Sequence, residues 1–166
     1  LDQHSRENTR NLISSADVVI ATGGAGMVGA AYSSGRPALG VGAGNVQCII
    51  DEGYDYKEAV PKIITGRAYD YGIICSGEQS VICPEKDFDD IMKEFEANGG
   101  YIIREPEKLQ AVRDALFIDG KPNRHSVGQS PEKIAELAGI EIPEGTKVIV
   151  VVAEGTGKTD SLGGEK

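Results

Sequence analysis

Residues 17–41, DVVIATGGAGMVGAAYSSGRPALGV, decide the fold that the sequence predicts. Residues 17–21 contain a continuous apolar run that is too short for a helix and is typical of a buried strand. After a glycine turn, apolar residues recur at helical spacing: Met27, Val28, Ala31 and Tyr32. Gly35 is a natural end for that helix, and Pro37–Val41 follows as a second strand. A strand, a helix and a strand in this order predict parallel strands joined by a right-handed crossover.

Strands and helices continue to alternate outside this stretch. We predict further helices near 5–15, 55–64, 88–95, 106–116 and 130–139, and further strands at 46–50, 79–83, 101–103 and 147–152. Pro61 must lie near the first turn of its helix, or it will kink that helix. The order predicts an α/β fold with an open, mostly parallel sheet and helices on both faces. Ligands bind such sheets at the carboxyl ends of the strands.

Composition narrows the class of protein. The 166 residues are 40% hydrophobic, which is enough for a packed core, and the net charge of −9 argues against nucleic acid or an anionic membrane as the main partner. No apolar run approaches the 18 residues or so of a membrane span. The three cysteines have no C-x-x-C spacing, so we expect free thiols in a reducing, cytoplasmic setting.

A glycine-rich motif follows the first predicted strand. Residues Gly24–Gly29 match G-x-G-x-x-G and open the helix, so free N–H groups there could hold a phosphate or face a nicotinamide. The alternative is that the glycines only turn the chain tightly. Asp51 is the one acidic residue near the spacing expected for a ribose contact, and it fits poorly because it follows a second strand. A dinucleotide would therefore bind in a mode other than the standard Rossmann one.

Cys75 is the candidate nucleophile. It follows a predicted helix and lies in a turn among Gly72, Ser76 and Gly77, where backbone N–H groups could stabilise an oxyanion. Cys48 and Cys83 lie in predicted strands and are better explained as packing residues. A buried structural role is the alternative for Cys75 as well.

The two ends of the sequence suggest a piece of a longer polypeptide. The sequence begins at Leu1, without Met, part-way into a helix-like segment, and it stops at residues 163–166 without a closing helix or strand. A short natural chain with a processed N-terminus is the alternative.

Several motifs in the same order resemble the CoA-acylating aldehyde dehydrogenases, including the aldehyde dehydrogenase half of bifunctional aldehyde–alcohol dehydrogenases. They are ATGGAGMV at 21–28, AAYSSG at 30–35, PALGVGAGN at 37–45 and ICSGEQS at 74–80, with SVGQS at 126–130 and IAELAG at 134–139. The resemblance runs across nearly the whole chain and is more specific than any single motif.

The resemblance implies NAD-dependent oxidation of a small aldehyde to acyl-CoA, through a thioester on Cys75, with coenzyme A as co-substrate and no metal. It places the cofactor at Thr22, Gly23, Gly24 and Gly26, with Gly42 near the nicotinamide. It also implies that residues 1–39 are a remnant of the NAD-binding domain and that residues 40–166 are an incomplete catalytic domain. The family's oligomerisation segment implies a homo-oligomer for the whole enzyme.

One position favours acyl transfer over hydrolysis. Hydrolytic aldehyde dehydrogenases carry a glutamate that activates water in the glycine-rich turn, and alignment of the turns places Val41 there, which cannot act as a base. A hydrolytic enzyme that uses another base, such as Glu78, and a non-catalytic nucleotide-binding module are the alternatives. The family's oxyanion-holding asparagine lies outside this chain and Asn45 is not its equivalent, so we expect the chain alone to be inactive.

Overall fold

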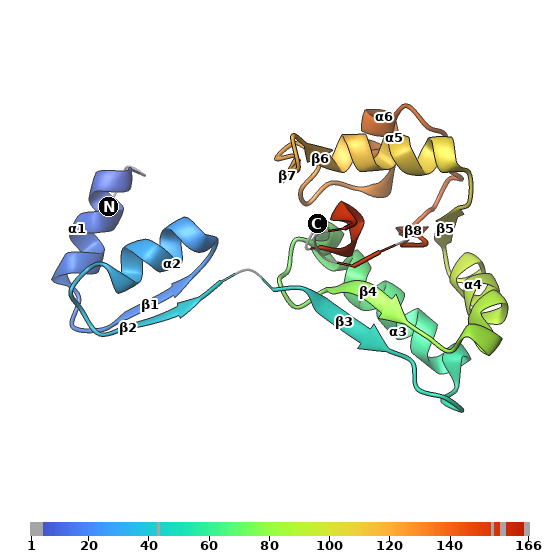
Figure 1. Cartoon of the computed structure of the whole chain (residues 1–166), viewed down its shortest axis with the longest axis horizontal. Coiled ribbons are helices and arrows are strands. Elements are labelled where there is room, and N and C mark those ends of the chain that lie inside the picture. Colours follow the sequence, from blue (N-terminus) through green and yellow to red (C-terminus); the bar gives the residue numbers. More distant parts are fainter. Residues whose placement is uncertain (1–4, 43, 154, 157–158, 165–166) are drawn as a thin grey trace. The chain divides into compact units, whose positions relative to one another are not determined.

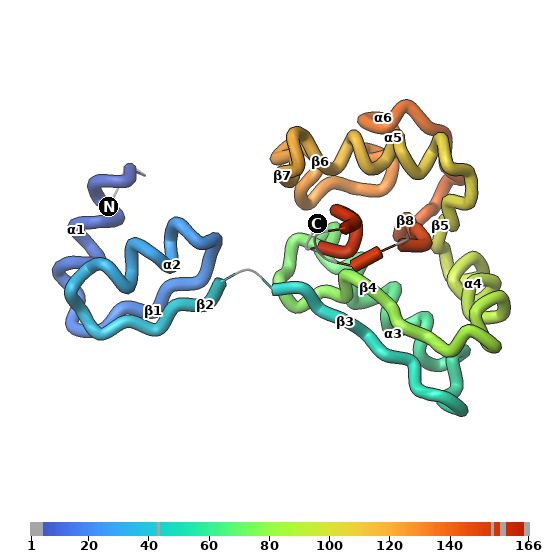
Figure 2. The backbone as a smooth tube through the Cα atoms, in the orientation of Figure 1, coloured from blue at the N-terminus to red at the C-terminus, as the bar shows by residue number. Residues whose placement is uncertain are grey.

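The computed structural model describes residues 5–42, 44–153, 155–156 and 159–164. They belong to two compact units, 1–44 and 45–166 (Figures 1 and 2). The division lies slightly beyond the predicted boundary after residue 39, so Gly42 falls in the first unit. Among the described residues, none of the helices combines the length and the apolar character that a membrane span requires.

The first unit contains the predicted strand–helix–strand stretch. Its elements are α1 (Arg6–Ser15), β1 (Val19–Thr22), α2 (Ala25–Tyr32) and β2 (Ala38–Val41). β1 and β2 pair in parallel, with Val19 opposite Ala38 and Thr22 opposite Val41. The predicted parallel pair is therefore confirmed, and the carboxyl ends of both strands lie side by side.

Both helices of this unit pack against one face of the β1–β2 sheet, around buried Val19, Ala21 and Ala31. α2 approaches β2 closely because Gly40 has no side chain: a Cβ there would lie 2.8 Å from atoms of Tyr32 and Val28. The Tyr32 hydroxyl accepts a hydrogen bond from the Gly40 N–H at 3.1 Å. Residues on the opposite face stay exposed, including Ile20 (76% exposed) and its partner Leu39 (64%).

The second unit repeats the alternation of strands and helices. Its longer elements are β3 (Val46–Ile49), α3 (Tyr56–Ala68), β4 (Glu78–Ile82), α4 (Phe88–Ala97), β5 (Gly100–Ile103), α5 (Pro106–Leu116), α6 (Pro131–Ala138) and β8 (Val148–Val151). Short elements fill the connections: the 3-10 turns η1 (Tyr69–Gly72), η2 (Glu85–Asp87) and η3 (Ser161–Gly163), and the strands β6 (Phe117–Ile118) and β7 (Lys121–Pro122).

Strand pairing confirms the predicted α/β class with mostly parallel strands. β3 pairs with β4 and β5 pairs with β8, both in parallel, whereas β6 and β7 form a small antiparallel hairpin. Within the described residues each hydrogen-bonded sheet has two strands. β4 and β8 do not pair with each other; both line a cavity of about 730 Å³. The main core lies between helices α3 and α4 and the strands β3, β4, β5 and β8, around Ile63, Ile91 and Phe95.

Helix α3 leads to the Cys75 turn. Asp55 caps this helix, because its Oδ1 accepts the Lys57 N–H at 2.9 Å. Pro61 is the sixth residue of α3, beyond the first turn, yet the helix continues without interruption to Ala68. Buried Val60, Ile63 and Ile64 hold this face of the helix in the core, which offsets the hydrogen bond that the proline lacks.

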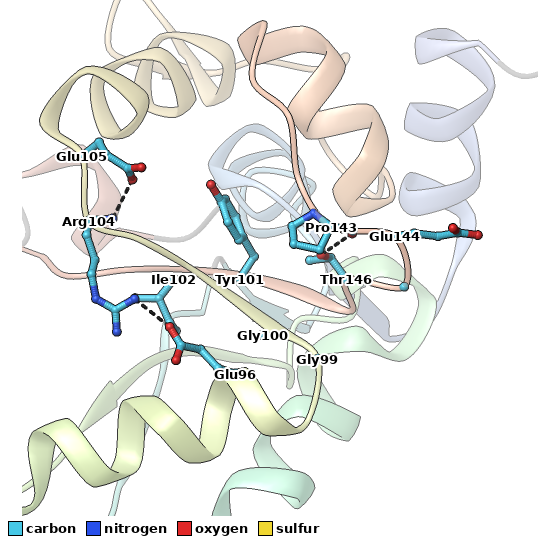
Figure 3. A pocket seen from close by; sticks show the side chains of 11 residues that line it. Glu96, Gly99, Gly100, Tyr101, Ile102, Arg104, Glu105, Pro143, Glu144 and Thr146 are labelled. Atoms are coloured by element: carbon cyan, nitrogen blue, oxygen red, sulfur yellow. Dashed lines mark hydrogen bonds and ion pairs between the residues drawn. The ribbon is translucent and has the colours of Figure 1, made fainter.

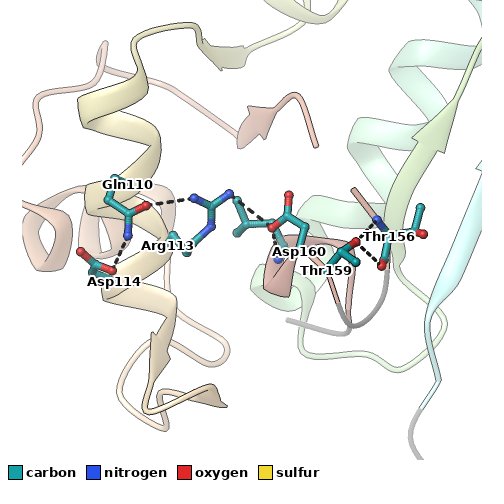
Figure 4. A network of polar contacts seen from close by, with 7 residues as sticks. Gln110, Arg113, Asp114, Thr156, Thr159 and Asp160 are labelled. Atoms are coloured by element: carbon teal, nitrogen blue, oxygen red, sulfur yellow. Dashed lines mark hydrogen bonds and ion pairs between the residues drawn. The ribbon is translucent and has the colours of Figure 1, made fainter. Parts of the chain in front are cut away.

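A polar network joins α5 to the last described segment of the chain (Figure 4). Arg113 Nη2 lies 3.3 Å from Oδ1 of Asp160, a carboxylate that is almost fully buried. The same oxygen accepts the N–H of buried Leu162 at 3.0 Å. This network anchors η3 to a helix 47 residues earlier in the chain.

Candidate active site

Cys75 occupies a tight turn between η1 and β4. The Gly77 N–H donates to the Ile74 carbonyl at 3.0 Å, so Cys75 and Ser76 are the two central residues of the turn. The Cys75 side chain is exposed and the thiol is free. The geometry therefore presents a sulfur atom to solvent on a short, hydrogen-bonded loop, as predicted from the glycines around it.

The other two thiols have different surroundings. Cys48 and Cys83 are half-buried and pack against the main core. Burial raises the pKa of the Cys48 thiol, and the negative charge of Glu78 raises it further. Burial likewise raises the pKa of Cys83, with a contribution from Asp87. Both thiols are thus held in the neutral form at physiological pH, which is the poorer nucleophile.

The backbone that enters the turn is strained. Asp70 (φ 47°), Tyr71 (φ 53°) and Gly72 (φ 73°) all adopt left-handed conformations in succession. Glycine adopts this region freely, but Asp and Tyr do so at an energetic cost, and such strain is concentrated at functional sites. The Arg67 side chain lies over this segment, with Nη1 3.4 Å from the Gly72 carbonyl oxygen.

Glu78, the first residue after the turn, points back toward α3. A Cβ at Gly66 would lie 2.4 Å from Glu78 Oε2, so the carboxylate packs directly on the glycine backbone. Among the described residues this oxygen is buried and has no hydrogen-bond partner. A carboxylate in this position is poorly placed to activate water for an attack on a Cys75 adduct.

The five predicted cofactor residues gather at one end of the sheet in the first unit. Thr22 ends β1, Gly23 donates its N–H to the Val41 carbonyl at 3.0 Å, and Gly24 caps α2. A Cβ at Gly24, Gly26 or Gly42 would meet nothing within 4 Å. The backbone at this helix start is therefore uncovered and fits the close approach of a dinucleotide. Cys75 belongs to the second unit and the five cofactor residues belong to the first.

Two cavities stand out among the described residues of the second unit. The first, of about 530 Å³, is lined by three glutamates and by Arg104, whose Nη1 is paired with Glu96 Oε1 at 2.6 Å (Figure 3). It contains none of the predicted site residues. The second, between β4 and β8, is lined in part by Ile73 and Ile74, the neighbours of Cys75. The described residues contain no group of His, Cys, Asp and Glu side chains suited to a metal ion.

The contribution of α3 to this site has no signal in the sequence. Arg67 and Gly66 lie within a helix, and nothing in their spacing indicates that the helix end contacts both sides of the Cys75 turn. Gly72 gave a partial signal, since a glycine that follows a helix often has positive φ. The left-handed conformations of Asp70 and Tyr71 had no such signal.

Proteins similar to this chain are found among both known sequences and solved structures. No protein-family model matches the sequence. The succinate-semialdehyde dehydrogenase (acetylating) of Clostridium kluyveri is 56% identical over 162 residues, which is 98% of this chain and 36% of the relative. The chain thus spans about a third of the length of this relative.

Solved structures agree. An acetylating aldehyde dehydrogenase from Geobacillus thermoglucosidasius superimposes with a TM-score of 0.91 at 40% identity, covering 96% of this chain and 36% of that one. The propionaldehyde dehydrogenase of Rhodopseudomonas palustris, solved with bound CoA and an acylated cysteine, gives 0.82 at 30% identity, covering 89% and 34%. The sequence and fold of this chain therefore match a segment of the acylating aldehyde dehydrogenases, which confirms the resemblance predicted from its motifs.

Proposed function

We propose that this chain is the cysteine-bearing segment of an NAD-dependent, CoA-acylating aldehyde dehydrogenase, with Cys75 as the nucleophile. The observation that carries the proposal is the Cys75 turn, which presents the one exposed thiol of the three. The structural neighbour with an acylated cysteine supports the same chemistry. In the longer enzyme we expect a small aldehyde and CoA as substrates, and a homo-oligomeric assembly.

The reaction follows from thiolate chemistry. The Cys75 sulfur adds to the aldehyde carbonyl carbon, which forms a C–S bond and moves an electron pair onto oxygen. When this adduct collapses, the carbon loses a hydride and becomes a thioester on Cys75. NAD, when bound, supplies the hydride acceptor. The CoA thiolate then attacks the thioester carbonyl, the C–S bond to Cys75 breaks, and acyl-CoA leaves with the thiolate regenerated; each step is reversible.

Residues of the first unit would bind the cofactor. Thr22, Gly23, Gly24, Gly26 and Gly42 lie where the carboxyl ends of β1 and β2 meet the start of α2, and their uncovered backbone would accommodate the dinucleotide. Two features support acyl transfer rather than hydrolysis: Val41 cannot activate water, and the Glu78 carboxylate packs on Gly66.

Product analysis of the longer enzyme tests the proposal. With aldehyde and NAD, we expect acyl-CoA when CoA is present and a thioester on the peptide that contains Cys75 when CoA is withheld, detected by mass spectrometry. Cys75→Ala should abolish both products, whereas Cys83→Ser should preserve them. Free acid formed equally fast without CoA would contradict acyl transfer, and activity of Cys75→Ala would contradict the nucleophile.

We also propose that residues 1–166 alone have little activity, because the chain spans 36% of the length of its relative and the resemblance places the family's oxyanion-holding asparagine outside it. NADH formation from aldehyde by the isolated chain would contradict this, with the longer enzyme assayed in parallel as the positive control.

A further inference from the structure

The last turn of α3 contacts both ends of the segment that carries Cys75. At the beginning of the segment, Arg67 Nη1 lies 3.4 Å from the Gly72 carbonyl oxygen. At its end, the Glu78 carboxylate packs on Gly66. Gly77 lies close to the same place, because a Cβ there would be 3.8 Å from the Gly66 carbonyl oxygen. Two adjacent helical residues thus hold a loop whose ends are six residues apart in the sequence.

The flat guanidinium group of Arg67 packs against Gly72. A Cβ on Gly72 would lie 2.7 Å from Arg67 Cζ and 3.0 Å from both Nε and Nη1. These three near-equal distances place the guanidinium plane against the glycine Cα. Gly72 is buried, whereas Asp70 and Tyr71 before it are exposed. The arginine is therefore the side chain that covers the Cα of Gly72, at the end of the strained segment.

The charge of Arg67 also has a counterpart. Burial lowers the pKa of the Arg67 guanidinium, and the negative charge of Glu78 opposes that shift. The guanidinium and the carboxylate are therefore close enough to interact electrostatically across the base of the turn. Three consecutive residues keep a left-handed conformation only when the surrounding structure holds them in it. The Arg67 side chain, which interacts with Glu78, packs on Gly72 at the end of the Asp70–Gly72 segment and can supply this support.

We propose that Arg67 is a positioning residue for Cys75: its guanidinium fixes the left-handed Asp70–Gly72 segment, which sets where the Cys75 sulfur meets the aldehyde carbonyl. The inference rests on the proposed role of Cys75. In this role Arg67 acts through the backbone at Gly72 and not on the reacting atoms. Its loss should slow the step that needs an exact sulfur position, and should leave the intrinsic reactivity of the thiol unchanged.

The test compares two rates in the longer enzyme. The first is the single-turnover rate of NADH formation, which requires Cys75 to be aligned with the aldehyde. The second is the rate of alkylation of Cys75 by iodoacetamide, followed by peptide mass spectrometry, which requires only an exposed thiolate. For Arg67→Met we expect the turnover rate to fall by about 10- to 100-fold, with the KM for the aldehyde and the alkylation rate each within about twofold of wild type.

Arg67→Lys should recover part of the lost rate, because it keeps the charge but lacks the planar group that covers Gly72. Arg104→Met is the matched control: it removes an exposed arginine of the same unit that pairs with Glu96, and its turnover should equal that of wild type.

Alkylation of the half-buried Cys48 and Cys83 reports folding in the same samples. An unchanged turnover rate in Arg67→Met would overturn the inference, and so would a loss of turnover with faster alkylation of Cys48 and Cys83, which would indicate a purely structural role. The Cys75→Ala variant, assayed in parallel, separates the two proposals. If Cys75→Ala remains active, the proposed function is wrong. If Cys75→Ala is inactive while Arg67→Met is fully active, only the inference about Arg67 is wrong.

Discussion

Gly72 combines two constraints, a positive φ of 73° and an arginine packed on its Cα. We expect Gly72→Ala to lower the free energy of unfolding by about 2–3 kcal/mol, because the methyl group adds a clash with Arg67 to the backbone strain. Gly53→Ala is the matched control in the same unit: its φ is 82° but its Cβ would meet nothing within 4 Å, so about 1 kcal/mol is expected. Urea unfolding measures both, and equal losses would show that the Arg67 contact contributes nothing.

Because of the half-buried thiols, the free energy of unfolding should decrease at alkaline pH. In the folded chain the pKa values of Cys48 and Cys83 lie above those of the unfolded chain, about 8.5. The contribution of the two neutral thiols to the free energy of unfolding is therefore fully present below the pKa of the unfolded chain. It is lost as the pH rises through the pKa values of the folded chain. We expect the free energy of unfolding to fall from about pH 8.5 upward, and to fall less steeply in the double variant Cys48→Ala, Cys83→Ala. Identical slopes in urea unfolding at pH 7.5 to 10 would contradict this.

At the level of elements, α3 contains a proline where a helix ordinarily disfavours one. Pro61 lacks the N–H for a bond to the preceding turn, so we expect Pro61→Ala to raise the free energy of unfolding by about 1–2 kcal/mol. Pro131→Ala is the control, since Pro131 begins α6 and gains nothing from a new N–H there. Thermal unfolding of the two variants side by side would contradict the prediction if Pro61→Ala melted at or below the wild-type temperature.

The sequence predicted every longer helix and strand because each carries an apolar period or a cap. The β6–β7 hairpin was not predicted, although its turn has a recognisable cause: Asp119 (φ 51°) and Gly120 (φ 71°) are the Asp-Gly pair typical of a type I′ turn. Strands of two residues are too short to show alternation. The Cys75 turn was predictable from Gly72 and Gly77, whereas the role of Arg67 depends on a contact between a helix end and a loop that no local pattern encodes.

For the second unit as a whole, the Arg113–Asp160 pair joins α5 to the last described segment. Asp160→Ala would leave Arg113, which is only 27% exposed, without this partner and Leu162 without its N-cap. We expect a loss of about 3 kcal/mol in the free energy of unfolding. Lys133→Met, which removes an exposed ion pair with Glu136, should change it by less than about 0.5 kcal/mol. If urea unfolding gave similar losses of free energy for the two variants, the Arg113–Asp160 pair would stabilise the fold no more than an exposed ion pair does.

The uncovered face of the β1–β2 sheet has a practical consequence for handling the chain. Ile20 and Leu39 form a paired apolar strip that faces water, while the net charge of −9 keeps copies of the chain apart. That repulsion is screened as ionic strength rises, and sulfate also strengthens apolar association. Purification in dilute buffer above neutral pH should therefore keep the chain dispersed, and light scattering should increase steeply when ammonium sulfate is added.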